Sequence, residues 1–325
     1  MIIKVREIPL IILYYEALLR RLPPQSRIRS KIEESLLKAW AGYHGECKAD
    51  RQLSTIDHPQ MLILNDLCIP IGKTFFQIDT LILTKTFILV LEIKNIAGTM
   101  EFGSEFDQFS RTYKGEVTGF PNPISQANRN MLHLSHWFQK KKLPLLPLDY
   151  LVVFTNSTSL LTSSNRHRKT VDKAIKVENL VAKYLSIQES YSRSKSVLIQ
   201  KELKKISNAL MKEHLPYSAF KEEHDEIIPG VRCSQCNRFN MVRQMRSWYC
   251  TACGIFDKVA HQQAIFDYLL LVNPTITNKR AREFLGVESS RVAYKLLNTM
   301  KLASEGTGKG RVYSLPQPNN QIQTK

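Results

Sequence analysis

Two acidic residues and one lysine interrupt apolar segments of this sequence. Glu92 and Lys94 lie near the end of the apolar run 87–95, and Asp79 lies in the apolar segment before it. Side chains alternate along a strand, so Glu92 and Lys94 would share one strand face. If Lys85-Thr86 is the turn of a hairpin, position 79 pairs with position 92. The two carboxylates would then lie directly opposite each other.

Two carboxylates in such proximity repel each other unless a cation lies between them. Asp79 and Glu92 offer the hard oxygen ligands that Mg²⁺ or Mn²⁺ prefers. Such a metal would polarise a phosphate and lower the pKa of its bound water, while Lys94 would position or deprotonate that water. The pattern therefore predicts phosphodiester hydrolysis. The alternative is an internal carboxylate–lysine ion pair that only tolerates burial, because the turn lacks the Gly or Asn of a tight hairpin.

Four of the six cysteines form two C-x₂-C pairs that are separated by 13 residues: Cys233, Cys236, Cys250 and Cys253. Two such turns complete the tetrahedron that Zn²⁺ favours, and four ligands leave no open position, so the zinc is expected to be structural. A redox dithiol needs only two cysteines and explains four poorly. The pattern is typical of a zinc ribbon in a reducing compartment, which favours a cytoplasmic protein. Neighbouring arginines suit phosphate contact, although a ribbon also serves for docking a protein partner or a second copy.

The C-terminal region predicts helices at 264–272, 278–285 and 289–300, with Thr277 as an N-cap and Gly286 as a stop signal. A hairpin is expected over 303–315. Residues 261–315 therefore resemble a winged helix-turn-helix. The expected nucleic-acid contacts lie on the recognition helix and the wing: Arg291, Tyr294, Lys295, Asn298, Lys309 and Arg311. The alternative is a small helical domain used for dimerisation or docking.

Helices and strands must bring the carboxylates and the lysine together. The hydrophobic periodicity predicts helices over 1–22 and 28–45, the second with an apolar face of Ile32, Leu36, Leu37 and Trp40. Strands are expected at 61–69, 74–84, 87–95, 98–102, 109–117 and 148–155, and a helix from Asn122-Pro123 to about 142. Residues 156–170 and 186–197 are interpreted as loops, and 197–214 as a charged helix. This order indicates an α/β or α+β domain.

Five ordered blocks of this region resemble the nuclease-related domain (NERD) family, within the PD-(D/E)XK nuclease superfamily. They are Gly42-Tyr43-His44-Gly45-Glu46, Phe76-Gln77-Ile78-Asp79-Thr80-Leu81, Leu91-Glu92-Ile93-Lys94-Asn95, Gly98 and Asn122-Pro123-Ile124-Ser125-Gln126. The resemblance covers about residues 38–150. It implies a mixed sheet flanked by helices, with Glu46 approaching the metal and Gln126 contacting the site or the substrate. The alternatives are that Glu46 is only a solvated residue and that Gln126 is only an ordinary residue of the first helical turn.

Composition points to a polyanion as partner. The chain of 325 residues has a net charge of +17. Residues 1–150 hold 19 basic and 15 acidic residues, and residues 151–325 hold 27 and 14, so most of the surplus lies in the second half. A solubility surface is the alternative. No segment reaches the ~18–20 apolar residues of a membrane span, and no aromatic platform for RNA stands out.

The expected organisation follows from these segments. It is a helical extension (1–29), a nuclease-like domain (30–190), a charged helix and linker (191–228), a zinc ribbon (229–258), a winged helix-turn-helix (261–315) and a disordered tail (316–325). The predicted function is a Mg²⁺- or Mn²⁺-dependent nuclease that acts on DNA and is targeted by the ribbon and the winged helix. The alternative is a non-catalytic, DNA-binding or regulatory protein that uses a nuclease-like platform.

Overall fold

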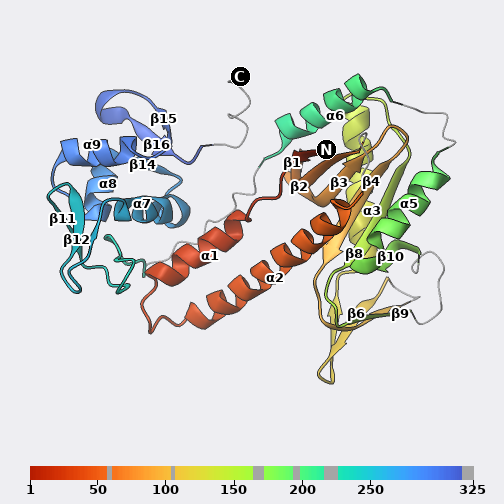
Figure 1. The fold of residues 1–325 in the computed structure, drawn as a ribbon, viewed down its shortest axis with the longest axis horizontal. Coiled ribbons are helices and arrows are strands. Elements are labelled where there is room, and N and C mark those ends of the chain that lie inside the picture. Colours follow the sequence, from red (N-terminus) through yellow and green to blue (C-terminus); the bar gives the residue numbers. More distant parts are fainter. Residues whose placement is uncertain (57–60, 104–106, 164–171, 193–197, 216–225, 317–325) are drawn as a thin grey trace. The chain divides into compact units, whose positions relative to one another are not determined.

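The chain folds into two compact units (Figure 1). The computed structural model describes residues 1–56, 61–103, 107–163, 172–192, 198–215 and 226–316. Unit 1 comprises Met1–Glu7 and Trp40–Tyr217, and unit 2 comprises Ile8–Ala39 and Ser218–Lys325. The chain therefore passes from unit 1 to unit 2 and back within its first 40 residues.

Unit 1 is built on a six-stranded sheet in the order β1-β2-β3-β4-β8-β10. Its strands are β1 (Ile2–Lys4), β2 (Leu62–Ile71), β3 (Thr74–Leu83), β4 (Ile88–Lys94), β8 (Leu148–Phe154) and β10 (Ala174–Lys176). Pairing is antiparallel between β2, β3 and β4, and parallel for β1 with β2, β4 with β8, and β8 with β10. The sheet is therefore mixed, as predicted from the sequence.

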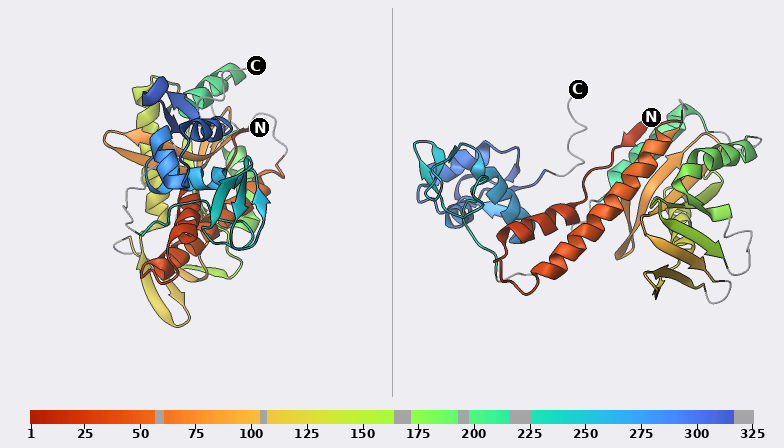
Figure 2. Two further views of the ribbon diagram at one scale, coloured as in Figure 1. Left: turned by 90° about the vertical axis from the view of Figure 1, so that its left-hand side faces the viewer. Right: turned by 60° about the horizontal axis from the view of Figure 1, so that its bottom comes forward.

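Helices cover both faces of this sheet (Figures 1 and 2). One face packs against α3 (Pro123–Lys140) and α6 (Gln200–Glu213). The other packs against the C-terminal part of α2 (Arg29–Leu53) and against α5 (Leu180–Ser190), which follows the short 3₁₀ helix η1 (Val177–Asn179). Because both faces are buried, the central strands are continuous apolar runs instead of alternating ones.

A smaller sheet in unit 1 has the order β7-β6-β5-β9. Its strands are β5 (Gly98–Phe102), β6 (Phe109–Tyr113), β7 (Glu116–Phe120) and β9 (Ser159–Ser163). The predicted single strand at 109–117 is wrong, because Lys114 and Gly115 both adopt positive φ (52° and 83°) and reverse the chain. The predicted loop at 156–170 contains β9, and its part 164–170 lies outside the described residues.

Two helix predictions and one loop prediction need correction. Residues 1–22 are not one helix, because Ile2–Lys4 pairs with β2 and α1 (Leu10–Arg21) begins after Pro9. Helix α2 continues to Leu53 instead of ending at 45, and Leu37 on its predicted apolar face is 70% exposed. The predicted loop at 186–197 begins within α5, which ends at Ser190. In each case tertiary packing overrides a local pattern.

Unit 2 contains two small three-stranded sheets. The first is β11 (Met241–Gln244), β12 (Ser247–Cys250) and β13 (Phe256–Asp257). The second has the order β14-β16-β15, built from β14 (Thr275–Thr277), β15 (Ala303–Glu305) and β16 (Val312–Ser314), with the 3₁₀ helix η2 (Gly308–Gly310) between the last two. The helices of its C-terminal part are α7 (Ala260–Leu271), α8 (Asn278–Leu285) and α9 (Ser290–Asn298). Thr277 caps α8, and Gly286 ends it with φ 68°, as predicted.

A buried ion pair ties the N-terminal helix α1 to α7 within unit 2. Arg21 Nε donates to Asp267 Oδ2 at 2.8 Å, and its Nη1 donates to the carbonyls of Ile228 and Gly230. Arg21 is 1% exposed and also lies over the Phe284 ring. Helix α1 therefore belongs to the same core as the C-terminal helices. Among the described helices, none is long and apolar enough to cross a membrane.

Candidate functional site

The β3–β4 hairpin places Asp79 beside Glu92. Its ladder pairs Leu83 with Ile88 and ends at Thr80 with Leu91, so the next pair in this register is 79 with 92. Asp79 Oδ2 accepts a hydrogen bond from Ile93 N at 2.7 Å. The predicted register is confirmed.

A threonine stabilises the turn of this hairpin in place of the missing Gly or Asn. Thr84 Oγ1 accepts from the backbone N–H groups of Thr86 and Phe87, at 3.3 and 3.0 Å. Thr84 N also donates to Phe87 O at 3.0 Å. These side-chain bonds supply local order that the turn sequence itself does not, and they hold the register that aligns the carboxylates.

Lys94 joins β4 to α3. Its Nζ donates to Glu92 Oε1 at 2.7 Å and to Gln126 Oε1 at 3.1 Å. Gln126 lies in the first turn of α3, which begins after Asn122, whose side chain accepts from Ile124 N. Asn130 Nδ2, one turn further along, donates to Gln77 O on β3 at 2.7 Å and fixes α3 against that strand. The sequence-predicted residues Glu92, Lys94 and Gln126 therefore meet in space.

Glu46 reaches the same site through an arginine that the sequence did not single out. Arg6 Nη1 donates to Glu46 Oε2 at 2.5 Å, and Arg6 Nε donates to Asp50 Oδ2 at 2.7 Å. Arg6 Nη2 donates to Asp79 O at 3.0 Å and to Thr80 Oγ1 at 2.8 Å. Arg6 was placed in a predicted helix, and only the pairing of β1 with β2 brings it here.

Burial raises the pKa of the carboxyl groups of Glu46, Asp79 and Glu92. Burial and then the charge of Asp79 raise the pKa of Glu92 to about 8 and that of Glu46 to about 7. The pKa of Asp79 is also raised, by burial above all, against the bond from Ile93 N and the charge of Lys94. Ionisation of these carboxyl groups is therefore unfavourable, and the positive charges of Lys94 and Arg6 offset this only in part.

The donor chemistry of these residues fits a divalent cation. Glu46, Asp79 and Glu92 offer only carboxylate oxygens, which Mg²⁺ and Mn²⁺ prefer. The hydrogen bonds described above use Oε1 of Glu92 and Oδ2 of Asp79. The three carboxylates are spread more widely than a closed metal cluster, since in the described residues only the cysteine group has all its ligand atoms within 4.8 Å.

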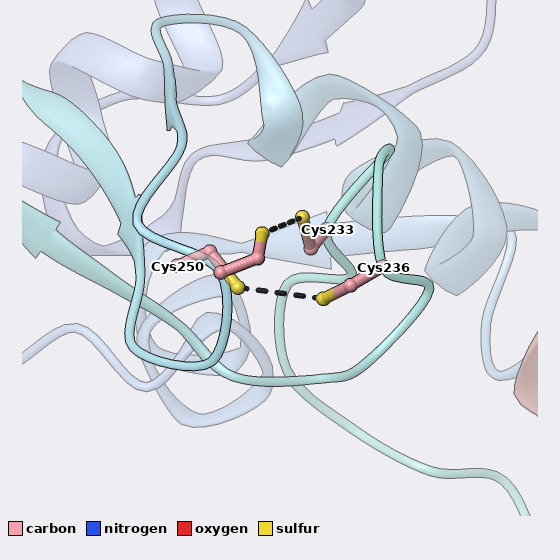
Figure 3. Close-up of side chains that lie close together, drawn as sticks. Cys233, Cys236 and Cys250 are labelled. Atoms are coloured by element: carbon pink, nitrogen blue, oxygen red, sulfur yellow. Dashed lines mark hydrogen bonds between the residues drawn. The ribbon is translucent and has the colours of Figure 1, made fainter.

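The four cysteines form that cluster in unit 2 (Figure 3). Cys233 Sγ lies 3.6 Å from Cys253 Sγ, and Cys236 Sγ lies 3.6 Å from Cys250 Sγ. All four sulfur atoms lie within 4.8 Å of one another. Gly254 leaves the second knuckle with φ 77°. Four converging thiols could bind a structural zinc ion and match the C-x₂-C spacing.

The residues predicted to contact nucleic acid lie on α9, in η2 and directly after η2, all in unit 2. Arg291, Tyr294, Lys295 and Asn298 are exposed on α9, and Tyr294 is 46% exposed. Asn298 Oδ1 accepts from Tyr313 OH at 3.2 Å. Hydrogen bonding with Tyr313 and Tyr294 raises the pKa of Arg311, so that residue lies beside the exposed face of α9. The side chain of Lys309 lies outside the described part of the chain.

A family comparison assigns the carboxylate-bearing region. Residues 41–155 match the model of the nuclease-related domain, which includes Glu46, Asp79, Glu92, Lys94 and Gln126 and leaves out Arg6. No curated protein and no solved structure matches the chain. The mixed sheet flanked by helices agrees with the fold that the resemblance implied. The chain therefore carries a nuclease-related domain at residues 41–155 and a four-cysteine cluster in unit 2.

Proposed function

We propose that this chain is a divalent-metal-dependent nuclease that hydrolyses phosphodiester bonds of DNA. The observation that carries the proposal is the convergence of Asp79, Glu92, Lys94 and Gln126 at the end of β4, in a nuclease-related domain. These residues come from two strands and one helix, and all four are buried or half-buried in a place where uncompensated charge is costly. Perturbed carboxyl groups with a lysine partner are typical of functional sites.

Asp79 and Glu92 would hold Mg²⁺ or Mn²⁺, with Glu46 close to them. Such an ion polarises a phosphate and lowers the pKa of bound water. Lys94 Nζ would lie beside the attacking water and the negative charge that develops on the phosphate, where an ammonium stabilises the transition state. Gln126 Oε1 accepts from Lys94 Nζ and thereby orients the ammonium for this role.

Unit 2 would target the nuclease domain to DNA. We assign a structural Zn²⁺ to Cys233, Cys236, Cys250 and Cys253, because four thiolates leave no position for substrate. The arrangement of α8, α9 and the β15–β16 hairpin supports a winged helix-turn-helix with α9 as recognition helix. Its exposed Arg291, Tyr294 and Lys295 are residue types that reach bases and phosphates, and the charge surplus of residues 151–325 favours a polyanion.

The test is cleavage of DNA in Mg²⁺ or Mn²⁺ by the wild type, Asp79→Ala and Lys94→Ala, with zinc content and circular dichroism to establish folding. Loss of a positioned proton-transfer group costs about 10²–10⁴ in rate, so Lys94→Ala should lose cleavage by at least that range. Asp79→Ala should also lose cleavage, because it removes a metal ligand. Lys48→Ala serves as the matched control, because Lys48 bonds to Thr155 O and not to a carboxylate. Equal cleavage by the wild type, Asp79→Ala and Lys94→Ala would refute the assignment.

A non-catalytic DNA-binding role is the second candidate. The observation in its favour is that the site's carboxylates are already paired with protein cations, Glu92 with Lys94 and Glu46 with Arg6. A platform that needs no metal would look similar. Under this candidate the wild type and the Asp79→Ala variant bind DNA equally and neither cleaves it, while substitution of Arg291 and Lys295 abolishes binding.

A further inference from the structure

Arg6 is embedded in the carboxylate site by all three of its guanidinium nitrogens. It is 8% exposed, and its side chain bonds to Glu46, to both oxygens of Asp50, to Asp79 O and to Thr80 Oγ1. Thr80 Oγ1 in turn donates to Asn65 Oδ1 at 3.1 Å, which leaves that hydroxyl's acceptor side for Arg6. A planar guanidinium matched on several sides in this way is held in one orientation.

The charges of this site balance only when carboxyl groups bind protons or a further cation binds. The carboxylates that Arg6, Lys94 and the Ile93 N–H contact are Glu46, Asp50, Asp79 and Glu92, and the protein cations among these partners are Arg6 and Lys94. Asp66, whose charge also acts on Glu46 and Asp79, has Lys4 as its own neighbouring cation. Two of the four negative charges therefore remain when all the groups are ionised. One divalent ion would cancel them, whereas two divalent ions would leave an excess of positive charge in a largely buried site.

The position of Arg6 divides the carboxylates into two groups. Its Nη1 and Nε hold Glu46 and Asp50 on α2, while Lys94 holds Glu92 on β4. An arginine side chain stays protonated in proteins, so Arg6 is a permanent cation beside Glu46 and Asp50.

We propose that Arg6 acts as a built-in cation that occupies the Glu46–Asp50 part of the site and restricts it to one divalent metal ion. This inference rests on the proposed function. Arg6 is a positioning residue, because it acts on Glu46 and on the metal count and does not touch the phosphate. It lies outside the residues that match the nuclease-related domain, so the N-terminal segment completes a site that the rest of the domain leaves with surplus negative charge.

The test counts Mn²⁺ ions bound per zinc-loaded full chain, by titration calorimetry and by the electron paramagnetic resonance signal of free Mn²⁺. The variants are Arg6→Met, which removes the charge, and Arg6→Lys, which keeps it. Arg21→Met is the matched control, because Arg21 is also a buried arginine bonded to a carboxylate and to backbone carbonyls, but in unit 2. Circular dichroism and zinc content report folding.

We expect one ion in the wild type, Arg6→Lys and Arg21→Met, and two in Arg6→Met. Adding Glu46→Gln to Arg6→Met should return the count to one, because the second ion would use that carboxylate. Two ions in the wild type would overturn the inference even if no variant folds. One ion in Arg6→Met, or two in Arg21→Met, would also overturn it while leaving the proposed nuclease intact. Absence of any bound ion would overturn the metal-dependent function, and the inference with it.

Discussion

The cysteine cluster and the carboxylate site gather their ligands in different ways. The cysteines come from 21 consecutive positions, 233–253, and all four sulfur atoms lie within 4.8 Å of one another. The carboxylates come from α2, β3 and β4. Two protein cations, Arg6 and Lys94, already contact Glu46 and Glu92. A closed set of thiols has a metal as its natural centre. A carboxylate site with its own cations can stay folded with the metal absent and keep room for substrate.

Loss of a cysteine ligand should have the largest effect, because structural zinc contributes about 10–16 kcal/mol of apparent binding free energy to folding. Cys233 is fully buried in the core of unit 2. We expect the Cys233→Ser variant to bind no zinc, and its unit 2 should no longer unfold cooperatively. The backbone amides of unit 1 should stay protected from hydrogen exchange. Cys47→Ser is the control and should keep its zinc. Full zinc content in Cys233→Ser would remove the contrast between the two sites.

The carboxylate site should instead show a pH effect in metal-free protein. Burial and Asp79 raise the pKa of Glu92 from 4.5 to about 8, so the folded state binds more protons than the unfolded state between these values. Stability therefore falls as the pH rises from about 4.5 to about 8. Thermal unfolding of unit 1, followed by hydrogen exchange, should show this fall. Glu92→Gln should flatten it, and Mg²⁺ should reverse it in the wild type. A flat profile in the wild type would show that Lys94 alone balances the charge.

A smaller effect is expected where α2 approaches the end of β4. A Cβ at Gly45 would lie 2.6 Å from Asn95 Cβ and 2.6 Å from Thr155 Oγ1, whereas one at Gly42 would meet nothing within 4 Å. Overpacking of this kind costs about 1–3 kcal/mol, so Gly45→Ala should destabilise unit 1 and reduce cleavage. Gly42→Ala should be neutral or stabilising by up to about 1 kcal/mol, since alanine favours a helix. Urea unfolding of the two variants measures the difference. Equal stability would mean that α2 shifts freely over the site.

The sequence alone determined the parts of this protein whose physical signals are local. The alternation along 74–95 and the turn at Lys85-Thr86 were enough to predict the register of Asp79 against Glu92. The C-x₂-C spacing predicted four converging sulfur atoms. Capping residues predicted α8, because Thr277 and Gly286 act on the backbone next to them.

Only the tertiary structure decided what comes to the site from far away in the chain. Arg6 reaches Thr80 across 74 positions and Glu46 across 40. No local pattern marks such a contact, since it depends on the parallel pairing of β1 with β2. Leu37 is an example of a local pattern that misleads: its apolar spacing predicted burial, yet its side chain is 70% exposed. Local periodicity indicates which face is apolar, and only the packed neighbours decide whether that face is covered.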